Sequence, residues 1–210
     1  MKILEITPQG CGSVFAELGE VVYDDKILEK YPKEVGLLVF TGGHDVWPEL
    51  YGENILQGTF FSTHRDLYEG RMFEIAQANK IPCVGICRGA QFLCVKAGGK
   101  LVQDITGHLV SHLLLTNDNR TILSNSSHHQ MQLPPEDAVP LAWSNNRMSR
   151  YYMNGDGDNI HVDKEYEVVY YPNINSLGIQ GHPEWGNASE EFIEYSREVV
   201  RGYLFKKGAK

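Results

Sequence analysis

Short apolar runs alternate with helical patterns along the first half of the chain. Residues 2–7 and 36–40 are apolar runs of strand length, and a third run leads into Cys87. Runs of this kind are typical of strands that are buried on both faces of a sheet. Residues 65–79 and 88–97 instead show the spacing of amphipathic helices. The pattern predicts an α/β fold with a mostly parallel, doubly wound sheet and helices on both faces.

The sequence indicates the buried face of the first predicted helix and the end of the second. In residues 65–79 the helical spacing makes Leu67, Phe73 and Ile75 candidates for the buried face. The helix at residues 88–97 is followed directly by two glycines, which commonly end helices.

The second half of the chain predicts additional, antiparallel strands. Four short runs are separated by Asn, Pro and Gly turns; they are residues 120–124, 139–144, 166–171 and 176–180. An amphipathic helix at about residues 188–205 follows, and residues 206–210 predict a solvated tail. Because no repeat or linker interrupts the chain, we expect residues 1–210 to form a single domain.

Residues 154–159 alternate acidic and amide side chains, as a calcium-binding loop does. The glutamate expected at the twelfth position of such a loop is missing. The segment is therefore interpreted as a connection between strands.

The composition of the chain argues against some classes of binding partner. A chain of 210 residues with 42% hydrophobic and 22% charged residues is ordinary for a globular protein. Its net charge of −8 argues against binding nucleic acid or an anionic membrane surface. No run approaches the roughly 18–20 apolar residues of a membrane span, and the N-terminus does not resemble a signal peptide. We therefore expect a cytoplasmic location, and the four cysteines fit reduced thiols better than a disulfide framework.

The segment around Cys87 predicts a strand that turns sharply into a helix with a cysteine at the turn. Gly85 and Gly89 stand two residues to either side, the spacing that allows a nucleophile to sit on a strained corner. A helix N-terminus stabilises a thiolate, so this position also predicts a lowered thiol pKa. The alternative is a buried structural thiol, since most free cysteines do no chemistry.

A second segment supplies the partners that a thiol nucleophile needs. His182 follows an apolar run, and Glu184 stands two residues later. His182 would accept the thiol proton and return it to the leaving group, while Glu184 would orient the imidazole.

These two segments resemble the signatures of the class I glutamine amidotransferase superfamily. The first has the form G-x-C-x-G-x-Q from Gly85 to Gln91, and the second has the form H-P-E. Residues 41–53 resemble the gamma-glutamyl hydrolase branch, which includes gamma-glutamyl amine hydrolases. Smaller pieces at residues 65–69, 98–105 and 125–130 resemble the same branch in the same order. The resemblance covers most of residues 36–186.

The resemblance implies a flavodoxin-like or Rossmann-like sheet and a Cys-His-Glu triad, without a cofactor. Ligands in such sheets bind beyond the carboxyl ends of the strands, where the segments at Gly43 and Cys87 should converge. The backbone amides of Gly43 and Arg88 are then the natural oxyanion donors. Gln91, at i+4 from Cys87, would face the pocket and hold the glutamyl end. Matching segments place Ser127 and His128 beside the substrate.

Three functions follow from the resemblance. The first is a cysteine-dependent hydrolase that cleaves the gamma-amide bond of glutamine or gamma-glutamyl amines through a gamma-glutamyl thioester. The second is a glutaminase subunit that supplies ammonia to a separate synthetase partner. The third is an inactive binding module on the same scaffold, against which the intact Cys87, His182 and Glu184 argue. A homodimer is compatible with each of them.

The chain departs from the family pattern at two positions. Gly181 stands where the family usually carries an aromatic residue, and Cys94 stands where asparagine is common. These changes leave the triad intact. They bear instead on the identity of the leaving amine, because residues around the pocket determine its shape.

Other polar residues are better explained by structural roles than by catalysis or metal binding. His108 and His112 would suit zinc if they shared a helix face, but no third ligand is evident, so no metal site is expected. His44, His64 and His161 are interpreted as surface or pocket-wall residues. A last group of polar side chains could contact substrate, but these side chains could equally form internal ion pairs and hydrogen bonds. The group consists of Asp45, Arg65, Asp66, Glu69, the Arg88 side chain and His129.

Overall fold

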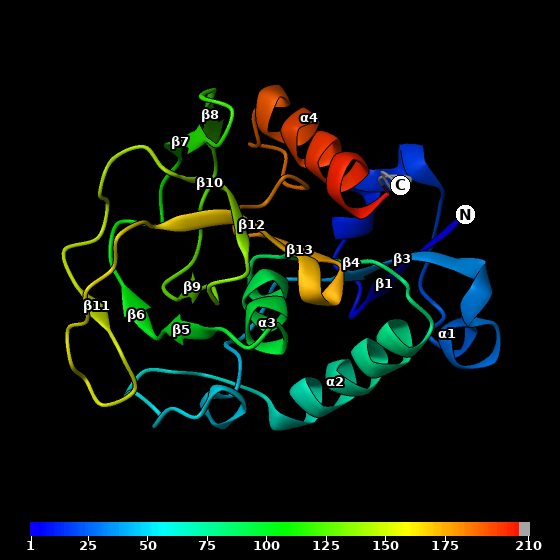
Figure 1. The fold of residues 1–210 in the computed structure, drawn as a ribbon, viewed down its shortest axis with the longest axis horizontal. Coiled ribbons are helices and arrows are strands. Elements are labelled where there is room, and N and C mark those ends of the chain that lie inside the picture. Colours follow the sequence, from blue (N-terminus) through cyan, green and yellow to red (C-terminus); the bar gives the residue numbers. More distant parts are fainter. Residues whose placement is uncertain (206–210) are drawn as a thin grey trace.

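The computed structural model describes residues 1–205 and contains a nine-stranded sheet within them (Figure 1). One half is parallel and consists, in spatial order, of β2 (Glu20–Val22), β1 (Lys2–Ile6), β3 (Val35–Phe40), β4 (Cys83–Ile86) and β13 (Ser176–Ile179). The other half is antiparallel and continues with β12 (Tyr166–Tyr171), β10 (Val139–Ser144), β7 (His112–Thr116) and β8 (Thr121–Ser124). The predicted parallel sheet with additional antiparallel strands in the second half is confirmed.

Helices cover both faces of this sheet (Figure 1). One face carries α1 (Lys26–Lys30), α2 (Thr63–Ala78) and α3 (Arg88–Lys96). The other face carries η1 (Cys11–Leu18), α4 (Glu190–Val199) and the π-helical turn η5 (Val200–Leu204). Apolar side chains from each layer form a separate core against the sheet.

Smaller elements fill the connections. Two two-stranded sheets pair β5 (Lys100–Val102) with β9 (Met131–Leu133) and β6 (Asp104–Ile105) with β11 (Tyr152–Met153). Single turns of 3-10 helix form η2 (Pro32–Glu34), η3 (Pro48–Tyr51) and η4 (Pro172–Ile174). Among helices within residues 1–205, none combines the length and apolar character needed to cross a membrane.

Most predicted elements agree with the structure to within about two residues, but the buried face of α2 was predicted wrongly in part. Phe73 is buried, whereas Leu67 is 64% exposed. The reason is that α2 turns two acidic residues, Asp66 and Glu69, toward the interior, where Arg88 pairs with both. Apolar spacing cannot reveal a buried face that contains paired charges.

The second half of the chain agrees less completely. Strand β7 was not predicted, and the predicted last helix divides into α4 and η5. Residues 154–159 form a tight turn in which the Asn154 side-chain oxygen accepts hydrogen bonds from the amides of Asp156 and Asp158, at 3.0 and 2.8 Å. The interpretation as a connection is confirmed. The predicted tail at 206–210 lies outside the described residues.

We predict that Gly85→Ala destabilises the protein by about 3 kcal/mol, the upper end for an overpacked core. A Cβ atom on Gly85 would lie 2.2 Å from the backbone oxygen of Gly89, so α3 would have to move off the sheet. Urea unfolding measures the change. The matched control is Gly186→Ala, where an added Cβ meets nothing within 4 Å. Equal stabilities of the two variants would contradict the packing argument.

Candidate active site

Cys87 occupies the corner between β4 and α3 in a strained backbone conformation. Its φ is 53° and its ψ is −109°, which is rare for a residue with a side chain. The corner is tight because a Cβ on Gly89 would lie 2.3 Å from the carbonyl oxygen of Phe40 on β3. The amide of Cys87 donates a 2.8 Å hydrogen bond to the carbonyl of Ile179 on β13. The corner is therefore held by both strands that neighbour β4.

His182 and Glu184 form a buried pair directly after β13. Nδ1 of His182 lies 2.8 Å from Oε1 of Glu184. The side chain of Asn125 holds the backbone of His182 on both sides, accepting from its amide at 2.9 Å and donating to its carbonyl at 2.8 Å. The indole of Trp185 stacks on the imidazole, with ring centroids 3.7 Å apart. These contacts fix the orientation of the ring.

Gly42 lies close to both Cys87 and His182. A Cβ on Gly42 would lie 3.7 Å from Cβ of Cys87 and 3.2 Å from Cε1 of His182. The residues after β3, β4 and β13 thus meet at the carboxyl edge of the parallel strands, as the sequence predicts. A side chain at position 42 would crowd the imidazole.

An N-terminal loop, which the sequence does not single out, also reaches the site. The Glu5 carboxylate accepts hydrogen bonds from four successive amides at residues 9–12, over 2.5–3.2 Å. This loop brings the Cys11 thiol to 3.4 Å from Oε1 of Glu184, and Gln9 donates to the carbonyl of Gly42 at 3.1 Å. No motif around Glu5 indicates this contact, because it depends on β1 lying beside β3.

A cavity of about 50 Å³ opens beside Cys87. The predicted nucleophile, oxyanion donors and substrate contacts all line it; they are Cys87, Gly43, Arg88, Gln91, Ser127 and His128. Asp45, His129 and Gln130 complete the lining. Gln91 is oriented by a 3.1 Å hydrogen bond from its Nε2 to the carbonyl of Gln130.

Burial has the largest effect on the pKa of the Cys87 thiol. It raises the pKa of the Cys87 thiol to about 12, although a hydrogen bond from the Arg88 amide to the sulfur acts in the opposite direction. The negative charge of Glu184 raises the pKa further. The pKa of the Cys87 thiol is thus raised, whereas the position at the helix N-terminus predicted a lowered one.

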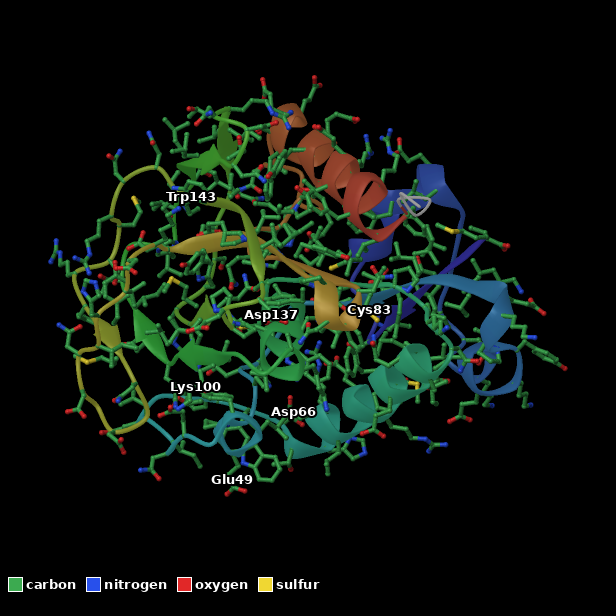
Figure 2. The ribbon with its side chains drawn as sticks, viewed as in Figure 1. Glu49, Asp66, Cys83, Lys100, Asp137 and Trp143 are labelled. Atoms are coloured by element: carbon green, nitrogen blue, oxygen red, sulfur yellow. The ribbon has the colours of Figure 1, made fainter. Side chains whose placement is uncertain are left out.

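The charged residues near the site pair internally. Figure 2 labels Asp66, which comes from α2 and pairs with the buried Arg88 guanidinium, as does Glu69. Arg65 donates to Glu69 at 2.8 Å and to the carbonyl of Thr41 at 3.1 Å. Burial lowers the pKa of Arg88 to about 9, which still leaves it charged at pH 7. The interpretation of the Arg88 side chain as a structural ion pair is confirmed.

Asp45 and His129 form a similar pair at the wall of the cavity. Asp45 accepts from the amide of Phe60 at 2.9 Å and lies 3.0 Å from Nε2 of His129. The hydrogen bond to Asp45 raises the pKa of His129.

The other histidines divide into two groups. His44, His64 and His161 are exposed, as predicted. His108 and His112 are buried, but they lie in a loop and at the start of β7 and so do not share a helix face. His128 and Glu167 converge with them, and three of these residues, His108, His128 and Glu167, are arranged closely enough to hold a metal ion. His128 lies in the loop after β8 and Glu167 lies on β12, so the sequence around His108 gives no sign of this group.

Gly181 does not enlarge the cavity. A Cβ on Gly181 would lie 2.5 Å from Oγ of Ser124, 2.8 Å from the carbonyl oxygen of Asn125 and 2.9 Å from Cζ of Phe192. The space beside its Cα is thus already filled. The missing aromatic leaves no void at this position.

Comparison with known proteins agrees with this geometry. The family model for Peptidase C26 matches residues 18–149. The chain belongs to the Peptidase C26 family. It is therefore a hydrolase of the glutamine amidotransferase-like group.

Relatives of this Peptidase C26 chain differ in the substrates that their names state. It is 32% identical to the glutamine amidotransferase-like protein YvdE of Lactococcus lactis, over 92% of this chain and 86% of the relative. It is 26% identical to the gamma-glutamyl-gamma-aminobutyrate hydrolase of Shigella flexneri, over 92% and 80%. It is 29% identical to the gamma-glutamyl-CDP-amidate hydrolase of Campylobacter jejuni, over 64% and 66%.

The fold is also that of a known amidotransferase. The crystal structure of a glutamine amidotransferase from Thermotoga maritima superposes with a TM-score of 0.61 at 18% identity, covering 100% of this chain and 86% of the other. At this identity the likeness establishes the fold of the Peptidase C26 chain.

The raised thiol pKa predicts how Cys87 reacts with iodoacetamide. The thiolate fraction, and with it the alkylation rate, should rise about tenfold per pH unit from pH 7 to pH 9, because both values lie far below the thiol pKa. Peptide mapping by mass spectrometry measures the rate at Cys87. Cys83 is the internal control, since burial also raises its pKa to about 12 but it lines no part of the cavity. A rate that is already constant near pH 7 would show a stabilised thiolate instead.

Proposed function

We propose that this chain hydrolyses the gamma-amide bond of glutamine or of gamma-glutamyl amines, with Cys87 as nucleophile, His182 as base and Glu184 as the residue that orients His182. The observation that carries the proposal is the strained corner at Cys87, which presents a thiol to a cavity that all the predicted contact residues line. Membership of the Peptidase C26 family and the names of the relatives support the substrate class.

The proposed reaction begins from the protonated thiol of Cys87, with His182 as the base. Nδ1–H of His182 donates to Glu184, so Nε2 is free to accept a proton. As Cys87 attacks the amide carbon, its proton passes to His182, and the imidazolium then protonates the departing ammonia or amine. Water, deprotonated by His182, cleaves the gamma-glutamyl thioester and releases glutamate. Transfer to His182 within the substrate complex removes the need for a thiolate in the free enzyme.

The amides of Gly43 and Arg88 are the proposed oxyanion donors. The Arg88 amide already hydrogen-bonds the Cys87 sulfur, so it points at the place where the new bond forms. Gly43 has a φ of 133°, and a Cβ there would lie 2.2 Å from the Arg65 guanidinium, so only glycine fits. Loss of one such donor typically costs about 100-fold to 1,000-fold in rate.

We infer that Gln91, Ser127 and His128 contact the glutamyl part of the substrate. Gln91 and His128 are buried in the cavity wall, whereas Ser127 is exposed. The cavity is small, so we propose that it encloses the amide end while the leaving amine extends outward past Ser127. The Asp45–His129 pair offers a carboxylate and an imidazole for the amino and carboxylate groups of a glutamyl moiety.

The proposal predicts glutamate release from at least one compound in a panel of gamma-glutamyl amides and glutamine, measured by mass spectrometry. Cys87→Ala should abolish turnover, whereas Cys83→Ala, a buried cysteine away from the cavity, should retain it. Hydroxylamine should divert the thioester to gamma-glutamyl hydroxamate in the wild type and in Cys83→Ala, but not in Cys87→Ala. Turnover that persists in Cys87→Ala would refute the mechanism.

The same panel separates the alternative functions. A glutaminase subunit would hydrolyse glutamine only when a cell extract supplies its synthetase partner. A binding module would release no glutamate in either setting. Either result would replace the proposal of an independent hydrolase.

We further expect Glu184→Gln to lower kcat by about 100-fold to 10,000-fold, the range of a positioned acid–base group. The amide oxygen can still accept from Nδ1–H of His182, but it carries no negative charge, so the imidazolium loses its counter-charge. The matched control is Glu191→Gln, an acidic residue at the start of α4. Steady-state kinetics at fixed pH measure the effect, and a KM change without a kcat change would contradict it.

A further inference from the structure

Three histidines surround one carboxylate on the far side of His128 from the cavity. His108 comes from the loop before β7, His112 begins β7, His128 follows β8, and Glu167 lies on β12. The side chains of all four residues are at most 4% exposed. None of them belongs to the proposed triad, although His128 also lines the cavity.

The ring nitrogens converge on a single oxygen atom. Oε1 of Glu167 lies 3.1 Å from Nδ1 of His108, 3.4 Å from Nε2 of His112 and 3.5 Å from Nε2 of His128. In a tetrahedral zinc site with bonds of about 2.0–2.1 Å, neighbouring ligand atoms are about 3.3 Å apart. The distances from Oε1 of Glu167 to His108 and His128 are close to such an edge, and the ligand atoms of these three residues all lie within 4.8 Å of one another.

The second nitrogen of each ring faces an acceptor. Nδ1 of His128 lies 2.8 Å from the carbonyl oxygen of Gln130, and Nδ1 of His112 lies 3.3 Å from that of Val110. A carbonyl oxygen only accepts, so these contacts place the hydrogen on Nδ1 and leave a lone pair on Nε2. Metal-binding histidines are oriented by outer hydrogen bonds of this kind.

His108 has the corresponding arrangement with a carboxylate. Its Nε2 lies 3.2 Å from Oε2 of Glu165, which leaves Nδ1 to face Glu167. Glu165 is itself held by the amides of Met148 and Ser149 and by the hydroxyl of Tyr152. A carboxylate, a histidine and a metal in this order form a common outer-shell arrangement.

These lone pairs point at a negative carboxylate. Although the distances are short, the contacts are not aligned as hydrogen bonds: Nδ1 of His108, Nε2 of His112, Nε2 of His128 and both Glu167 oxygens have no hydrogen-bond partner among the described residues. Buried polar groups in this state are costly. A cation bound between His108, His128 and Glu167 would satisfy the unpaired atoms of these three residues at once.

We propose that His108, His128 and Glu167 bind one divalent metal ion, with zinc as the preferred species, because their ligand atoms all lie within 4.8 Å of one another. Two imidazoles and a carboxylate form a donor set suited to zinc, and the fourth position of a tetrahedron is left to water. The site joins the loop before β7 and strand β12 to the segment at residues 127–130, which forms one wall of the cavity beside Cys87.

The test is the metal content of the full chain, purified without a histidine tag. Elemental analysis should find about one equivalent of zinc per chain. Removing the metal with a chelator should lower the Tm by about 5 °C or more, and adding zinc should restore it. Cobalt added to the metal-free protein should give the intense visible absorption of a tetrahedral site.

Variants locate the site independently of activity. Glu167→Gln and His108→Asn should each weaken cobalt binding by at least about 100-fold, and Glu165→Gln by about 10-fold to 100-fold. His161→Asn, an exposed histidine paired only with Asp163, should bind as the wild type does. If a variant fails to fold, the zinc content and cobalt spectrum of the wild type still decide the question.

Two outcomes would overturn the proposal. One is a wild-type protein that holds no stoichiometric zinc and gives no tetrahedral cobalt spectrum, which would mean that protons on the histidines balance Glu167. The other is unchanged cobalt affinity in Glu167→Gln, which would place the metal elsewhere.

Discussion

The backbone corner at Cys87 is the constraint on which the rest of the candidate active site depends. A positive φ at a residue with a side chain costs about 1–3 kcal/mol and persists only when its surroundings enforce it. Here β3 and β13 hold β4 from both sides, and glycines at positions 85 and 89 allow α3 to approach the sheet. The energy of sheet pairing and close packing thus keeps the thiol at the carboxyl edge of the parallel strands.

Arg88 connects this corner to the second helix layer. Its amide contacts the Cys87 sulfur, while its guanidinium reaches in the other direction to Asp66 and Glu69 on α2. Removing one partner from such a buried group typically costs about 3–5 kcal/mol, because a charge is left without compensation. Arg88 therefore contacts the Cys87 sulfur through its backbone amide and joins α3 to α2 through its side chain.

Desolvation raises the pKa of the Cys87 thiol and the helix N-terminus lowers it, and the effect of desolvation is larger. Charge stabilisation by a helix end is worth about 0.3–1 kcal/mol at exposed positions and up to about 2 in favourable ones. Burial of Cys87 outweighs it, and the nearby carboxylate of Glu184 adds to the cost of a second negative charge. In the proposed mechanism, activation of the thiol therefore depends on His182, whose backbone is held by Asn125 and whose ring is covered by Trp185.

The sequence by itself determined the alternating α/β architecture and the residues around the cavity, because strand length, helical spacing and the short motifs at Cys87 and His182 are local properties. It did not determine the inward face of α2, where charges are buried in pairs, or the protonation of Cys87, which depends on the protein that surrounds it. Only the tertiary structure brought Glu5, Asn125 and the histidines around Glu167 into contact. These contacts join strands and loops that are distant along the chain, and no local pattern records which distant side chains will share a buried space.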